Sequence, residues 1–201
     1  NDLILWARMK ASTPKDLGPK KLSPTYNNSP SVTGSLIHTK EYPAVRCSES
    51  DSQNAQVLSS DGLFSFNRRG TLSTPSNTSD QSFSVSLWIK TTSLSATQHL
   101  FAKGQNSSNY EYKAYIDTNG AITFSLYDDL YVAEEKVTTA DNVVSLNTWH
   151  HIVCTYDGRG GSDANLGLKI YLDGEDLSTT PADSGTYRGM WTFVTQLWIG
   201  S

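Results

Sequence analysis

The sequence contains little cysteine. Its 201 residues include two, Cys47 and Cys154, which excludes a disulfide-rich scaffold and any zinc site built mainly from thiolates. A single bridge between the two and a pair of free thiols are both compatible with the sequence, and we expect two free, partly buried thiols.

Long apolar runs and an excess of positive charge are also missing. No apolar run approaches the roughly 18 residues that would span a bilayer, so we expect no membrane insertion. The formal net charge is −4, and the Lys and Arg residues are scattered. A nucleic-acid binder usually carries a basic stripe, so we expect no nucleic-acid partner.

Motifs for catalysis are absent as well. Glycoside hydrolysis by two carboxylates about 5–5.5 Å apart needs them at alternating positions of a strand, and no Glu-x-Asp-x-x-Glu run or near variant occurs. Glu134 and Glu135 are adjacent, so they point to opposite sides of a strand. There is neither a Gly-x-Ser-x-Gly elbow nor a Gly-rich phosphate loop. The sequence therefore predicts that the protein is not an enzyme.

No metal site is predicted. A calcium loop uses oxygen ligands at alternating positions and ends in a bidentate carboxylate. Residues 157–163 resemble one superficially, but Arg159 occupies a ligand position and no terminal Glu follows, so we interpret them as a flexible hairpin connection. His150 and His151 are adjacent on an expected strand and cannot share a metal. We therefore expect no cofactor, and calcium stays open without a supporting motif.

What the sequence does contain is aromatic bulk within short alternating runs. Five Trp, ten Tyr and six Phe can fill a broad core between two sheets. The runs are separated by Gly, Asn, Asp, Ser and Pro, which is typical of a β-sandwich, and helical periodicity is almost absent. We expect a long loop at residues 10–33. Strands are expected at residues 3–9, 34–48, 55–58, 62–68, 82–90, 98–103, 149–157, 166–173 and 196–201, with a hairpin at 110–127.

The register of the hairpin at 110–127 follows from its apolar positions. Side chains on one face must lie opposite each other, which favours a three-residue loop ending in Gly120 in the left-handed conformation. A two-residue loop would set Asp117 opposite Ile122 and mix the two faces. This register pairs Ile116 with Ile122, Ala114 with Phe124 and Tyr112 with Leu126, and it places Glu111, Lys113, Tyr115, Thr123, Ser125 and Tyr127 on the other face.

Three segments and a closing strand occur in a recognisable order: Phe83–Lys90, Trp149–Gly158, Leu168–Glu175 and Leu197–Gly200. Together they resemble the laminin-G and pentraxin-like modules of the concanavalin A-like lectin/glucanase superfamily. The resemblance covers roughly residues 62–201, and residues 1–61 match only loosely. It implies one domain over residues 1–201, an all-β, two-sheet antiparallel jelly-roll sandwich. It also implies a non-catalytic module that binds carbohydrates or proteins, or that serves in larger assemblies.

The sequence departs from this family in two places. A closing strand usually follows the Ile-Gly segment, but the sequence stops at Ser201. We therefore expect that the sandwich lacks its last strand and that the chain is a segment of a longer protein. The calcium ligands of pentraxins lie beyond this point and are not carried over. Nor is their core disulfide, because the strand at 83–90 has no Cys and Cys154 is one position away from the expected place.

The polar face of the hairpin is the candidate binding surface. Aromatic rings stack on the C–H faces of sugars, while amides, hydroxyls and carboxylates fix the orientation of the ligand. A plain solvated sheet face is the alternative interpretation, since Tyr favours strands anyway. The candidate ligand-binding residues are Tyr115, Tyr127, Lys113, Glu111, Tyr131 and Trp191.

Two roles are consistent with these features. The first is a non-catalytic carbohydrate-binding or adhesion module of a larger protein, with a glycan or protein ligand. The alternative is a structural or assembly domain exposed on a viral particle, as a capsid decoration, tail or appendage protein. The scarcity of cysteine fits the alternative, because secreted modules more often carry a disulfide. Both roles imply an extracellular or virion-surface location, and both leave room for an oligomer or a larger assembly.

Overall fold

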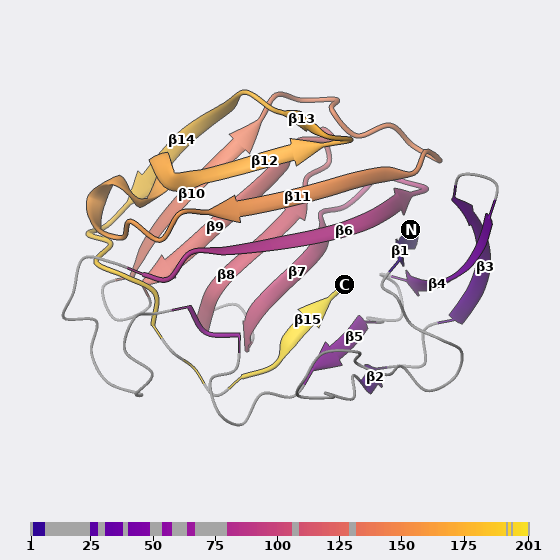
Figure 1. Ribbon diagram of the computed structural model, residues 1–201, viewed down its shortest axis with the longest axis horizontal. Coiled ribbons are helices and arrows are strands. Elements are labelled where there is room, and N and C mark those ends of the chain that lie inside the picture. The colour runs from indigo at the N-terminus through magenta and orange to yellow at the C-terminus, as the bar shows by residue number, and fades with distance from the viewer. Residues whose placement is uncertain are drawn as a thin grey trace.

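Two antiparallel sheets stack face to face in the computed structural model of the protein (Figure 1). The structure describes the backbone of residues 2–6, 25–27, 31–37, 40–48, 54–57, 64–66, 80–105, 109–128, 132–191, 193 and 195–200, and side chains from residue 64 onward except at 105 and 109. The described strands confirm the predicted all-β, two-sheet sandwich.

The first sheet contains seven of the described strands in the order β13-β12-β11-β6-β1-β4-β3. Strand β6 pairs with β11 over the whole length of β11, and β1 bridges β6 and β4. The strands of this sheet are β1 (Asp2–Trp6), β3 (Ser31–Ile37), β4 (Lys40–Ser48), β6 (Phe83–Thr91), β11 (His150–Tyr156), β12 (Leu168–Leu172) and β13 (Glu175–Asp176).

The second sheet contains eight described strands in the order β14-β10-β9-β8-β7-β15-β5-β2. β15 pairs with both β7 and β5, so it lies inside this sheet and not at its edge. The strands are β2 (Thr25–Asn27), β5 (Asn54–Val57), β7 (Gln98–Gln105), β8 (Asn109–Ile116), β9 (Ile122–Asp128), β10 (Ala133–Thr139), β14 (Thr179–Ser184) and β15 (Leu197–Ile199).

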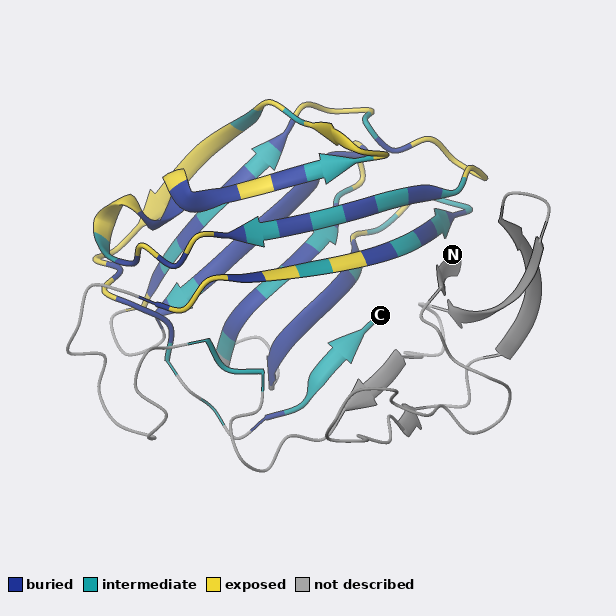
Figure 2. Ribbon diagram, viewed as in Figure 1, coloured by how far each residue is buried: buried dark blue, intermediate teal, exposed yellow. Residues whose placement is uncertain are grey.

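The core lies between the sheets, and the burial pattern of each strand shows why these residues form it. Along β6, Phe83, Leu87 and Ile89 are buried, and the intervening side chains are at least partly exposed (Figure 2). This period of two is what a strand with one buried face requires. The Phe83 ring stacks on Phe66 at 4.3 Å between centroids and also meets Tyr112 at 4.8 Å.

The predicted hairpin register is confirmed at each of its three pairs. Gly120 has φ +75°, and Asp117 N donates to Ala121 O, which closes the predicted loop. The Asp117 carboxylate also accepts the N–H groups of Asn119 and Ala121. A second predicted turn, at Asp173–Gly174, has positive φ at both residues and joins β12 to β13.

Several sequence-based expectations were wrong. A strand was expected at residues 62–68, but the described residues 64–66 are not in a strand. The ring of Phe66 packs on the core residue Phe83. Residues 25–27 and 31–33, expected to be loop, are strands, and residues 161–167 form the 3-10 helix η4 (Gly161–Gly167). Strand β10 was not predicted because two of its core-facing positions are polar, Glu135 and Thr139. Edge strand β14 is mostly exposed and contains Pro181, so it has no alternation to detect.

The buried carboxylate of Glu135 links β10 to η4. Its side chain is on the core side of the strand, and the residue is 2% exposed. Oε2 accepts the backbone N–H of Asn165 at 3.3 Å. Burial raises the pKa of Glu135 to about 7, and this single hydrogen bond only partly opposes that effect, while Asp183 and Asp163 add to it.

Replacing Glu135 by glutamine should flatten the pH dependence of stability. The pKa in the folded state lies above the ordinary value of 4.5, so the wild-type free energy of unfolding falls as pH rises from about 4.5 to about 7. Glu135→Gln removes this contribution and keeps an acceptor for Asn165. At pH 8 the variant should be more stable by up to about 3 kcal/mol, and near pH 4 the two should match. Urea unfolding at both pH values measures the difference; equal gains at both would show that burial of charge is not the cause.

Candidate ligand-binding face

Four side chains gather on the outer face of the eight-stranded sheet. The Lys113 Nζ lies 4.6 Å from the ring centroid of Tyr110, 5.6 Å from that of Tyr115 and 5.1 Å from that of Tyr127. The rings of Tyr110 and Tyr127 also contact each other at 5.6 Å. We call Lys113, Tyr110, Tyr115 and Tyr127 the tyrosine–lysine cluster. An ammonium over several aromatic faces is a favourable cation–π arrangement.

A β-bulge brings Tyr110 into the cluster. Strict alternation would put Tyr110 on the core side together with Tyr112. The ladder between β7 and β8 instead pairs Lys103 with Tyr112 and then Gly104 with Tyr110, so Glu111 has no partner across the ladder. An extra residue of this kind re-aims the side chains beside it. It therefore allows Tyr110 to reach Lys113 and Tyr127.

A hydrogen-bonded carboxylate borders the cluster on β10. Glu134 lies directly across from Tyr127, whose hydroxyl donates to Oε1 at 2.6 Å, and Lys136 Nζ donates to Oε2 at 2.9 Å. Burial alone would raise the pKa of Glu134, but these hydrogen bonds hold it below its usual value. Glu134 is therefore ionised at neutral pH, and both of its oxygens are engaged.

A cavity of about 240 Å³ opens beside the cluster. Tyr110 belongs to its wall, and Ala102 in that wall pairs directly with Lys113. Two nitrogens of the lining side chains, His99 Nδ1 and Trp198 Nε1, are buried and have no hydrogen-bond partner in the described part of the chain. Burial, together with the charge of Lys113, lowers the pKa of His99, so its imidazole is neutral at pH 7. The cavity is lined by His99, Phe101, Ala102, Gly104, Tyr110, Trp198 and Gly200.

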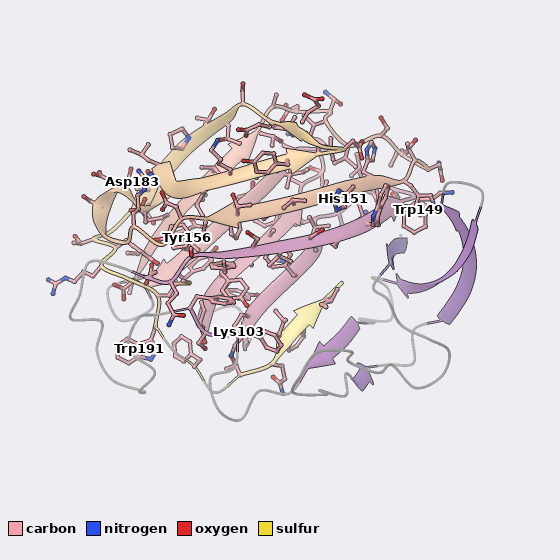
Figure 3. The ribbon with its side chains drawn as sticks, viewed as in Figure 1. Lys103, Trp149, His151, Tyr156, Asp183 and Trp191 are labelled. Atoms are coloured by element: carbon pink, nitrogen blue, oxygen red, sulfur yellow. The ribbon has the colours of Figure 1, made fainter. Side chains whose placement is uncertain are left out.

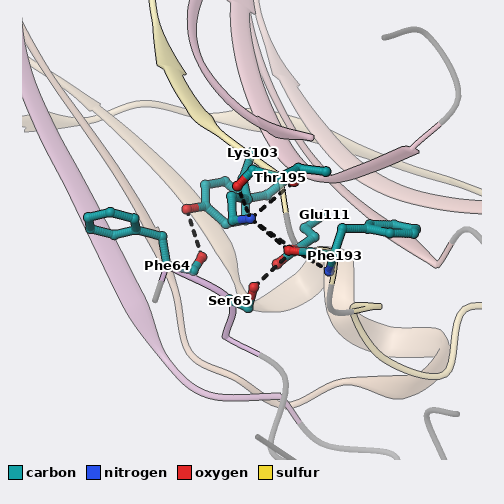
Figure 4. Close-up of polar contacts among 7 residues, drawn as sticks. Phe64, Ser65, Lys103, Glu111, Phe193 and Thr195 are labelled. Atoms are coloured by element: carbon teal, nitrogen blue, oxygen red, sulfur yellow. Dashed lines mark hydrogen bonds and ion pairs between the residues drawn. The ribbon is translucent and has the colours of Figure 1, made fainter. Parts of the chain in front are cut away.

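Glu111, a predicted site residue, is not on this surface. It is fully buried, and its Oε1 accepts from Ser65 Oγ at 2.9 Å and from Phe193 N at 2.7 Å (Figure 4). Lys103 Nζ lies 3.4 Å from the same oxygen and donates to the carbonyls of Phe193 and Thr195. The bulge at Glu111 turns its side chain away from the face that alternation predicts. Its role is to hold residues 65 and 193 against β8.

The other predicted site residues are placed as follows. Lys113, Tyr115 and Tyr127 are brought together, as described above. Tyr131 lies outside the described residues. Trp191 lies on the segment that leads into β15 (Figure 3), where its ring meets that of Phe193 at 6.3 Å, and it is not among the residues that line the cavity.

The two adjacent histidines face opposite sides, as predicted. His150 is buried, and its Nδ1 lies 2.7 Å from Asp173 Oδ2. His151, labelled in Figure 3, stacks on Trp88 at 5.0 Å and hydrogen-bonds Ser86. Within the described ranges, no group of three or more His, Cys, Asp or Glu side chains is arranged to hold a metal ion.

The remaining sequence motifs have structural roles. Asp157 and Arg159 of the superficial calcium loop form an ion pair at 2.6 Å. Cys154 is a free, buried thiol, and burial raises its pKa.

None of the helices in the part of the chain that the structure describes is long and apolar enough to cross a membrane.

Sequence reasoning missed three residues of this face: Tyr110, His99 and Trp198. Tyr110 was assigned to neither face, and no sequence signal indicates the bulge that brings it to the outer one. His99 and Trp198 lie far apart in the sequence and line the same cavity because β7 pairs with β15. Knowledge of that strand order would have found them.

Comparison with known proteins agrees with this architecture. A family model described as the concanavalin A-like lectin/glucanases superfamily, of the laminin-G type, matches residues 64–201. The chain is similar to the pentraxin-related protein PTX3 of Bos taurus, at 27% identity over 99 residues, and to that of Mus musculus, at 28% over 100. These matches cover 49% and 50% of this chain and only 23% of each relative. With a match over residues 64–201 and the sandwich fold that goes with it, the chain belongs to the laminin-G-type family of the concanavalin A-like lectin/glucanases superfamily.

Proposed function

We propose that the chain is a non-catalytic carbohydrate-binding module whose ligand docks on the outer face of the eight-stranded sheet. The observation that carries this proposal is the tyrosine–lysine cluster beside a cavity with two buried nitrogens that have no hydrogen-bond partner among the described residues. Family membership and the likeness to pentraxin-related proteins support a binding module in general. The proposal implies an extracellular location or one on the surface of a particle.

The chemistry of the face suits a sugar. A pyranose presents an apolar C–H face that stacks on an aromatic ring, and hydroxyls on its rim. The half-buried rings of Tyr115 and Tyr127 offer stacking surface, and the cavity beside them offers polar nitrogens. Few precisely placed polar groups among apolar walls are the usual composition of a small-molecule site.

Truncating either ring should weaken glycan binding. Tyr115→Ala or Tyr127→Ala is expected to raise the Kd of a bound glycan about tenfold, the equivalent of about 1.4 kcal/mol, because a stacking surface is lost. A glycan array, run with calcium and again with a chelator, identifies the ligand, and isothermal titration measures the Kd of each variant. Loss of binding with the chelator would add a metal to the site.

Tyr171→Ala is the matched control. Tyr171 lies on β12, on the outer face of the other sheet, beside Lys169. This variant should bind as the wild type does. Equal loss in Tyr171→Ala would move the site to the other sheet. The absence of any glycan binding would overturn the proposal and favour the assembly role on a viral particle.

A further inference from the structure

We propose that the sugar bound on this face is acidic: it carries a carboxylate, which the Lys113 ammonium and the Trp198 indole N–H receive at the mouth of the cavity. This inference rests on the proposed carbohydrate-binding function and specifies the class of sugar. Uronic acids and sialic acids share the required chemistry, a pyranose ring with one carboxylate.

The Lys113 ammonium has no described acidic partner. None of the described carboxylates lies within ion-pair distance of its Nζ, and Glu134, which borders the cluster, is already engaged by Tyr127 and Lys136. Three aromatic rings replace part of the water around the ammonium. A cation that has lost water without gaining a carboxylate favours an anionic ligand, because charge-assisted hydrogen bonds are the strong ones.

The composition of the cavity wall also favours an anion. No acidic side chain is among its described lining residues. The Trp198 indole nitrogen can only donate a hydrogen bond, as can the ammonium of Lys113, whereas an ionised carboxylate can only accept. A buried donor without a partner costs about 1–3 kcal/mol, and a ligand acceptor would remove that cost. Groups that can only donate therefore favour a carboxylate, which only accepts. A hydroxyl is less suitable because its own O–H also needs an acceptor.

Lys113 and Trp198 lie on the same side of the sheet. Lys113 lies directly across the ladder from Ala102, and Ala102 lies across from Trp198 on β15. Facing residues on three neighbouring strands share one side of a sheet. Lys113, Ala102 and Trp198 thus form one row, and Tyr110 and His99 flank it in the cavity wall. Both donors therefore lie on one side of the sheet, the side that carries the tyrosine rings.

Binding of paired glycans tests this without changing the protein. The probes are a glucuronate-terminated oligosaccharide and a sialylated trisaccharide, each compared with its carboxyl-reduced counterpart, in which a primary alcohol replaces the carboxylate. At least one acidic probe is expected to bind about tenfold or more tightly than its reduced form, and the advantage should shrink as salt is raised. Which probe binds distinguishes uronic from sialic acid.

Lys113→Met should abolish the preference for the acidic probe. Lys169→Met is the matched control, since it removes the same charge from the outer face of the other sheet, and it should keep the preference. Equal binding of acidic and reduced glycans by the wild type would overturn this inference and leave the carbohydrate-binding proposal standing. Binding of only neutral glycans would do the same. No binding of any probe, acidic or neutral, would overturn both.

Discussion

Replacing Lys103 by methionine is expected to lower the free energy of unfolding by about 3–5 kcal/mol, because it leaves the buried carboxylate of Glu111 without its cation. Both side chains are fully buried, and the pair joins β7 and β8 to the segment before β15. Burial raises the pKa of Glu111 to about 7 and lowers that of Lys103, and the attraction between the two side chains opposes both shifts. Urea unfolding at pH 8, above the pKa of Glu111 in the intact pair, measures the loss.

Two further variants separate the ion pair from simple packing. Lys169→Met breaks the exposed pair with Asp176 and should change stability by about 1 kcal/mol or less. Adding Glu111→Leu to Lys103→Met should recover part of the loss, because the uncompensated charge is removed. If the double variant is as unstable as the sum of two independent losses, the interpretation of this pair as a coupled unit is wrong.

Asp80→Ala should produce a loss of similar size, about 3–5 kcal/mol. Asp80 is buried, and its carboxylate accepts the Tyr156 hydroxyl at 3.0 Å, the Tyr187 hydroxyl at 2.7 Å and the Met190 N–H at 2.8 Å. Alanine would leave three buried donors without an acceptor, at about 1–3 kcal/mol each. Thermal and urea unfolding measure the loss.

Graded replacements check the cause of that loss. Asp80→Asn keeps one carbonyl oxygen and should cost less than alanine. Tyr187→Phe removes a single hydroxyl and should cost about 1 kcal/mol. If Asp80→Ala is no worse than Tyr187→Phe, the carboxylate does not hold these segments together.

The fold could be predicted to a large extent because its signals are local. The hairpin register followed from the apolar positions of β8 and β9 and from the demand of Gly120 for a left-handed turn, and each pair was confirmed. Strand β10 escaped prediction because Glu135, a carboxylate, occupies a core position where an apolar residue would have marked the pattern. A buried ionisable residue is an exception that only tertiary contacts explain.

The candidate site could be predicted only in part. Lys113, Tyr115 and Tyr127 share one hairpin, so a local register was enough to bring them together. Tyr110 depends on a bulge, and Trp198 depends on the pairing of β15 with β7, a contact between distant parts of the sequence. The same bulge is the reason why Glu111 was misplaced. Alternation describes a regular strand and fails where the ladder gains a residue.

The most direct test of the central claim is where a bound glycan perturbs the chain. We would record the tryptophan indole N–H signals of the ¹⁵N-labelled protein by NMR while titrating the best acidic glycan from the array, after assigning Trp198 and Trp88 with Trp→Phe variants. The account predicts that the Trp198 signal shifts in a saturable way and that the Trp88 signal, on the other sheet, stays in place. A saturable shift of Trp88 with an unmoved Trp198 would contradict it.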